Sequence, residues 1–156
     1  MRLKTTLPLE KATAIIAEAR RLGRDADLLP LTVVVLDAGG KLIAAESEDG
    51  SGILRFDIAL GKACGALGMG ISSRQIRDRL AKRPTFQGAL AAASDGRFVP
   101  VPGGVLIEDG EGDTIGAVGI SGDTSEKDEY CAVGGIRSVG LVPNPPEPAP
   151  NWQGSS

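Results

Sequence analysis

Apolar positions recur at helical spacing in five stretches of the chain. Between residues 7 and 22 apolar side chains return every three or four positions, with arginine and glutamate between them, which predicts an amphipathic helix that ends at Gly23. Two short later stretches have Ser72 as a cap and Pro84 as a break, and the last opens with Asp123 and Glu126 in capping-box spacing. The predicted helices cover residues 7–22, 54–69, 73–83, 85–92 and 124–137.

Two further stretches alternate in the manner of strands around glycine turns. They are LTVVVLDAGGKLIAAES at 31–47 and GGVLIEDGEGDTIGAVGIS at 103–121, and each predicts a hairpin. Four residues of the first hairpin recur 72 positions later in the second, as Asp37/Asp109, Gly40/Gly112, Ile43/Ile115 and Ala45/Ala117. We therefore expect an α/β (α+β) fold, an antiparallel sheet of two similar hairpins flanked by helices, in a single domain of ordinary size.

Charge and hydropathy exclude two classes of partner. The net charge is −3 with both signs interspersed, so the chain lacks the basic field that binds nucleic acid. No run of eighteen apolar residues occurs, and the N-terminus lacks the pattern of a signal peptide. We expect a cytoplasmic protein without nucleic-acid or membrane partners.

Histidine is absent from the sequence, which contains two cysteines. This excludes serine and cysteine catalysis that depends on histidine, and histidine-ligated zinc or haem. Cys64 and Cys131 are too few for a disulfide framework and are not spaced as a metal pair. We predict small buried thiols and no metal site.

The segment GAVGISGDTSEKDE, residues 116–129, spaces its glycines three apart. A dinucleotide fingerprint needs Gly-x-Gly-x-x-Gly and an acidic residue about 20 positions later, where this chain is already proline-rich, so dinucleotide binding is rejected. Gly116 is expected inside a strand that another backbone approaches closely. The N–H groups of residues 121–124 are expected either to bind a carboxylate or similar anion or to be capped by the chain itself.

The C-terminal segment from Leu141, LVPNPPEPAPNWQGSS, is dominated by proline, which neither continues a helix nor donates to a sheet. We divide the chain into a domain at 1–140 and a proline-rich arm at 141–156. Two alternatives remain for the arm: a disordered end, or an extended segment whose Trp152 docks on a neighbouring subunit.

Three ordered segments resemble the GlcG/HbpS-type family, which includes haem-binding proteins and the C-terminal domain of PduO-type corrinoid proteins. They are VVVLDAGGKLIA, DIALGKACGALGMG and GRFVPVPGGVLIEDGEGDTIGAVGISGDTSEKDE, and the resemblance spans about residues 7–139. It implies a profilin-like sheet and a homo-oligomer, from dimer to octamer. It also implies a small-molecule pocket, often near a subunit boundary, built from the Gly-Gly segment, the Gly-x-Ser-Gly segment and the helix at 54–69.

The resemblance places the candidate site residues in that pocket. Lys62, in the helix signature, is the expected cation or proton-transfer group, and Asp128 is either its acid–base partner or a carboxylate that complements the helix dipole. Arg55 and Asp57 form an internal ion pair or orient the ligand. The floor of the pocket is expected to be Gly103, Gly104, Ser121 and Gly122.

Two departures from the family pattern affect this expectation. Leu106 stands where the family commonly has a proline, which changes the lip of the pocket. Without histidine, haem iron could be bound only by a hydroxyl or by one of five other side chains: Cys64, Cys131, Met69, Tyr130 or Lys62.

The favoured hypothesis is therefore an oligomeric small-molecule-binding protein that takes haem or another carboxylate-bearing organic ligand. The alternative is a cofactor-free lyase or isomerase, in which Lys62 and Asp128 transfer protons on a small catabolic substrate. One basic cluster either is a solvated helix face or contacts the acidic segment 46–49 of another subunit; it consists of Arg74, Arg77, Arg79, Lys82 and Arg83.

Overall fold

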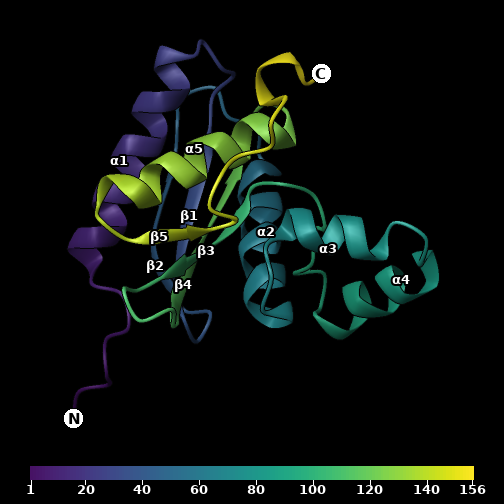
Figure 1. Cartoon of the computed structure of the whole chain (residues 1–156), viewed down its shortest axis with the longest axis horizontal. Helices are drawn as coiled ribbons and strands as arrows, with labels where there is room; N and C mark the ends of the chain where they lie inside the picture. Colours follow the sequence, from purple (N-terminus) through teal and green to yellow (C-terminus); the bar gives the residue numbers. More distant parts are fainter.

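Five strands form one antiparallel sheet in the computed structural model, which describes residues 1–156 (Figure 1). The two predicted hairpins are present, and they pair through their inner strands to give the order β2-β1-β4-β3-β5. The α+β fold expected from the sequence is thus confirmed. The strands are β1 (Thr32–Asp37), β2 (Leu42–Ser47), β3 (Gly104–Glu108), β4 (Thr114–Ser121) and β5 (Val142–Asn144).

Five helices surround this sheet, and all five were expected from the apolar spacing. They are α1 (Leu9–Asp25), α2 (Arg55–Met69), α3 (Ser73–Leu80), α4 (Pro84–Ala93) and α5 (Ser125–Ser138), with a 3₁₀ turn η1 at Trp152–Gly154. None of them has the length and apolar character required to span a bilayer. In Figure 1, α3 and α4 lie beyond α2, away from the sheet.

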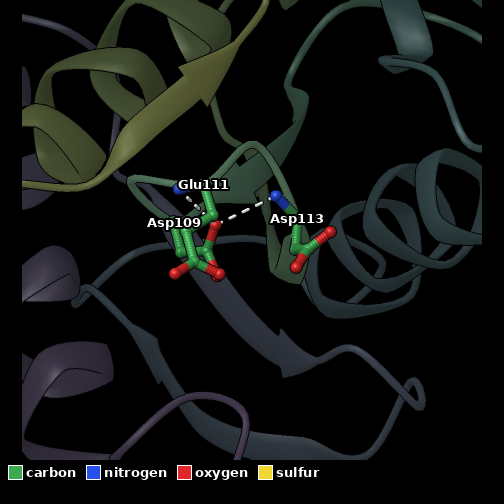
Figure 2. A group of neighbouring side chains, drawn as sticks. All are labelled: Asp109, Glu111 and Asp113. Atoms are coloured by element: carbon green, nitrogen blue, oxygen red, sulfur yellow. Dashed lines mark hydrogen bonds between the residues drawn. The ribbon is translucent and has the colours of Figure 1, made fainter.

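The two hairpin turns are built in the same way. In each, an aspartate carboxylate, of Asp37 or Asp109, accepts bonds of 2.9–3.0 Å from the backbone N–H groups two and four positions later. A glycine with a φ of 82° or 86° follows three positions after each aspartate, a conformation that favours glycine. Figure 2 shows the second turn, where this bonding brings Glu111 and Asp113 beside Asp109. The 72-residue repeat therefore extends to the hydrogen bonds of the turn.

The two faces of the sheet bury different kinds of side chain. Along β1, Val33 and Val35 join a cluster of 17 buried residues beneath α1 and α5, whereas Val34 and Leu36 face the other way and join a cluster of seven with alanines of α2. This alternation is the two-residue period of a strand. Large aliphatic side chains therefore fill one face, and small side chains fill the face under α2.

Helix α2 lies close against the sheet because two glycines lie beneath it. Gly104 and Gly119 are directly paired across β3 and β4. A Cβ at Gly104 would overlap the backbone oxygen of Lys62, and one at Gly119 would overlap that of Ala59. Any larger residue would force the helix away, so this pair fixes the depth at which Lys62 enters the interior.

Several predicted helix ends were wrong by one to three residues, among them the start of α1, which is Leu9, and the end of α3, which is Leu80. Helix α1 continues past Gly23 to Asp25, because Gly23 is a packing position: a Cβ there would lie 2.7 Å from the side chain of Leu31. The N-cap of α5 is Thr124, whose hydroxyl accepts the N–H of the residue three positions later. Asp123 instead accepts bonds from two other backbone N–H groups.

The proline-rich segment packs on its own chain. Its β5 pairs antiparallel with β3, and Trp152 stacks on Tyr130 of α5, with ring centroids 3.8 Å apart and planes 8° from parallel. The backbone N–H of Ala149 donates to buried Glu129. The segment is thus ordered, and the contact of Trp152 is within the chain; the division at residue 140 stays a prediction.

Two of the five residues of the predicted basic cluster are paired with carboxylates of the same chain. Arg74 pairs with Glu129 and Arg77 with Glu126, at 3.0 and 3.1 Å. The acidic segment 46–49 likewise has internal partners, since two of its glutamates pair with arginines of α1. Arg79, Lys82 and Arg83 form no ion pair within the chain, and the contact between subunits stays a prediction.

Candidate functional site

Lys62 and Asp128 form a buried ion pair between α2 and α5. Lys62 Nζ lies 3.0 Å from Asp128 Oδ2 and donates a second bond of 2.8 Å to the carbonyl of Ile120. The other carboxylate oxygen accepts the N–H of Asp123 at 3.0 Å. Each residue of the pair is 1% exposed. Burial lowers the pKa of Lys62 and raises that of Asp128, and their mutual attraction opposes both shifts.

The predicted floor residues lie near this pair, and the space beside them is occupied by neighbouring protein atoms. Gly103 has a φ of 117°, and a Cβ there would lie 2.8 Å from Lys62 Nζ. Ser121 is buried, and a Cβ at Gly122 would overlap the carbonyl oxygen of Pro30. The structure contains four hollows, and none is lined by these residues. Their role in ligand binding stays a prediction.

Arg55 and Asp57 do not pair with each other. Arg55 is half-buried and donates from Nη1 to Ser121 Oγ at 3.1 Å, whereas Asp57 is exposed and lies in no ion pair. The residues just before α2 are exposed apolar ones, since Ile53 is 94% and Leu54 65% exposed. Arg55 thus stands at the edge of an exposed apolar surface.

Carboxylates of the chain itself occupy the N-terminus of α5. Asp128 accepts the N–H of Asp123, and Asp123 accepts that of Thr124. Negative charge is favourable at this end of a helix, so the anion expected there from the sequence is supplied internally. The capping alternative is confirmed.

An open pair of hollows lies on the other side of α2. The larger has a volume of about 340 Å³ and reaches the β1–β2 turn. The smaller, of about 190 Å³, reaches α4 and is lined by Met69, Leu90 and Phe98 among others. We call the two together the Cys64 hollow, since they share four lining residues: Cys64, Gly68, Ser94 and Arg97.

The chemically active groups of the Cys64 hollow are a thiol and a guanidinium. Cys64 is half-buried and free; burial raises the pKa of its thiol and the charge of Arg97 lowers it. Arg97 is exposed, donates from Nε to the carbonyl of Ser94 at 3.2 Å, and forms no ion pair. An anionic group in the hollow would therefore meet a cation without a competing carboxylate.

Sequence reasoning missed this hollow because its walls come from three separate segments. None of these segments carries a ligand-binding motif, and Arg97 was not singled out. The one available signal was chemical, since Cys64 and Met69 were both among the donors left for haem iron.

The candidate ligands for haem iron differ sharply in their exposure. Lys62 and Cys131 are 1% and 0% exposed, and Tyr130 is stacked on Trp152. Cys64 and Met69 both line the Cys64 hollow. The donor set therefore fits haem at this hollow, through sulfur, and does not fit it at the Lys62–Asp128 pair.

Comparisons with known proteins agree with the fold. A curated relative, described as an uncharacterized 15.0 kDa protein in the dhaT-dhaS intergenic region of Citrobacter freundii, is 31% identical over 128 residues, which are 81% of this chain and 86% of the relative. The similar solved structures include a PduOC:heme complex, with a TM-score of 0.77 and 23% identity over 86% of this chain and 96% of that one.

Two more structures share the architecture. The Klebsiella pneumoniae protein ORFY has a TM-score of 0.79 at 24% identity and covers 90% of this chain and 94% of its own. HbpS has a TM-score of 0.74 at 23% identity, with 88% and 93% covered. The family model described as "Haem degrading protein HbpS-like" matches residues 7–137, and the chain therefore belongs to the HbpS-like family.

Proposed function

We propose that this chain is an oligomeric small-molecule-binding protein whose Cys64 hollow takes haem or another carboxylate-bearing organic ligand. The observation that carries the proposal is the position of Arg97, a cation without an ion pair at the border of a partly apolar hollow. Ligand pockets typically combine apolar walls with a few placed polar groups. Haem has this character, with an apolar ring and two carboxylates.

Each wall of the hollow has a role in this proposal. The apolar side chains of Leu67, Leu90 and Phe98 would contact the ring system. Gly68 presents no side chain, and nothing lies within 4 Å of the place where its Cβ would stand, which leaves room for a flat molecule. The haem-related family description and the haem complex among the similar structures support haem as the first ligand to test.

The assembly into oligomers rests on the exposed apolar surface at the start of α2. Ile53 is 94%, Leu54 65% and Phe56 36% exposed, and consecutive exposed apolar residues mark interaction surfaces. Light scattering on the purified protein tests this part: a single monomeric mass at micromolar concentration would contradict it.

The lyase or isomerase alternative stays a prediction. Lys62 and Asp128 lie within hydrogen-bond distance, as proton exchange between them would require. Both are completely buried, however, and no hollow reaches them. A substrate would need α2 to move away from the sheet, against the close contacts at Gly104 and Gly119.

Titration with haemin tests the leading proposal, with Arg97 beside the hollow and Arg55 at the start of α2 as a matched pair of arginines. Arg97→Ala should weaken saturable haemin binding about tenfold, since a charge-assisted hydrogen bond contributes about 1.5–3 kcal/mol. Arg55→Ala removes the same group 42 positions earlier and should leave binding unchanged. The proposal fails if the unmodified protein shows no saturable binding, or if Arg55→Ala weakens binding and Arg97→Ala does not.

A further inference from the structure

We infer that Cys64 Sγ is the iron ligand when the Cys64 hollow holds haem, so that this histidine-free chain binds haem iron through a thiolate. The inference rests on the proposed function, and it adds a residue and a chemical role at the same site.

Cys64 lies in the wall that the two hollows share. A flat ligand that spans both would have its centre near this wall, where the only side chains with electron pairs to donate are Cys64 and Ser94. A thiolate binds haem iron in known haem proteins, whereas an aliphatic hydroxyl is a poor ligand. Met69 lines only the smaller hollow, away from this shared wall.

The helix turns Cys64 away from the closed region. Cys64 follows Lys62 by two residues, and residues two apart point to nearly opposite sides of a helix. Lys62 therefore enters the interior, where it is 1% exposed, while Cys64 remains half-buried beside the hollow. Gly68, one turn further on, leaves this side of the thiol uncovered.

Burial raises the pKa of the Cys64 thiol, and the charge of Arg97 opposes this shift. Arg97 is the nearest cation to act on the thiol, and it is not neutralised by a carboxylate. On ligation the S–H bond breaks, the proton passes to solvent, and a sulfur lone pair forms the bond to Fe(III) in place of a bound water. No atom changes oxidation state in this step.

Cys131 provides an internal control for this inference. It is the second free thiol of the chain, but it lies on the buried face of α5 in the core and is 0% exposed. Each variant removes one thiol, so a difference between the two variants reports the position of the thiol and not the number of thiols.

The experiment compares haemin with metal-free protoporphyrin IX, on the unmodified protein and on Cys64→Ala, Cys64→Ser and Cys131→Ala. Haemin should bind at least about tenfold more tightly than protoporphyrin IX to the unmodified protein. Its reduced carbon monoxide complex should show the red-shifted Soret band that is characteristic of thiolate ligation. Both features should be lost in Cys64→Ala and Cys64→Ser and kept in Cys131→Ala, with circular dichroism confirming the fold of each variant.

Failure of the inference is distinguishable from failure of the proposed function. If both porphyrins bind equally, or if the thiolate band survives in folded Cys64→Ala, Cys64 is not the ligand, although the hollow still binds a carboxylate-bearing ring. Loss of the preference for haemin over protoporphyrin IX in Met69→Leu, with that preference retained in Cys64→Ala, would likewise overturn the inference and assign the iron to the thioether. If neither porphyrin binds the unmodified protein, the proposed function fails as well.

Discussion

The two sides of helix α2 show opposite uses of a reactive side chain. Lys62 points toward the sheet, has both of its partners within 3.0 Å, and has no hollow beside it. Cys64, two residues later, points to an open hollow with an unpaired arginine at its border. A charged residue of a family signature, such as Lys62, can therefore have a structural role, while the reactive group that a ligand can reach belongs to Cys64, two residues later.

The closed side is nevertheless costly to alter. A buried ion pair contributes little beyond what apolar residues would, but removing one partner leaves an isolated charge in the interior. The structure satisfies every buried polar side-chain atom, and the Lys62–Asp128 pair accounts for two of the seven buried polar or charged residues. Substitutions on the two sides of α2 should therefore differ in their effect on the free energy of unfolding, whatever their effect on ligand binding.

The largest expected difference is between Lys62→Ala and Cys64→Ala. Loss of Lys62 strands the Asp128 carboxylate and should lower the free energy of unfolding by about 3–5 kcal/mol, as measured by urea denaturation. Cys64→Ala removes one half-buried sulfur and should cost less than about 1.5 kcal/mol.

The double variant Lys62→Met/Asp128→Leu sharpens this comparison. It buries no charge and should recover part of the stability lost in Lys62→Ala. Unchanged stability in Lys62→Ala would show that the pair is not structural, and would favour the enzyme alternative.

A smaller difference is expected between two glycines. Gly104→Ala places a Cβ against the backbone of Lys62 and near Ser73 Oγ, and should cost about 1–3 kcal/mol by overpacking. Gly68→Ala meets nothing within 4 Å and should stabilise the helix by about 0.5–1 kcal/mol. Thermal unfolding measures both, and a destabilised Gly68→Ala would show that the wall of the hollow is not open as described.

The smallest expected effect concerns thiol labelling. Burial raises the pKa of Cys131 to about 12, so its thiolate is scarce at neutral and mildly alkaline pH, and a disulfide reagent should modify only Cys64 in the folded protein. Haemin should slow this labelling about tenfold if it occupies the hollow. Equal labelling of both thiols would show that Cys64 is no more accessible than Cys131. Labelling that haemin does not affect would show that haemin does not cover Cys64.

The fold was largely predictable because its determinants are local. Strand alternation, Gly turns and the 72-residue repeat are visible in the sequence, and the repeated Asp turn follows from Asp37 and Asp109. β5 was not predicted, because proline argues against a strand and its pairing with β3 depends on an edge formed by distant residues. Trp152 was predicted to dock on another subunit or to lie in a disordered end, whereas in the structure it stacks on Tyr130 of its own chain.

The site was less predictable, because burial is a property of tertiary packing. The sequence indicated Asp128 as a possible partner of Lys62, and the two residues do pair. It could not show that Gly104 and Gly119 let α2 lie close enough to the sheet to bury the pair. Arg97 follows α4 in a segment without a motif, and only folding brings it beside Cys64.

The most direct test of ligand binding in the Cys64 hollow is to map which amides a diamagnetic ligand perturbs. Metal-free protoporphyrin IX is added to ¹⁵N-labelled protein, and amide chemical shifts are followed by two-dimensional NMR. If the Cys64 hollow binds the ligand, saturable shifts are expected for the amides of Gly39, Gly68 and Ser94, while those of Ser121 and Asp128 stay unmoved. Shifts confined to Ser121, Gly122 and Asp128 would contradict it and place the ligand on the Lys62 side of α2.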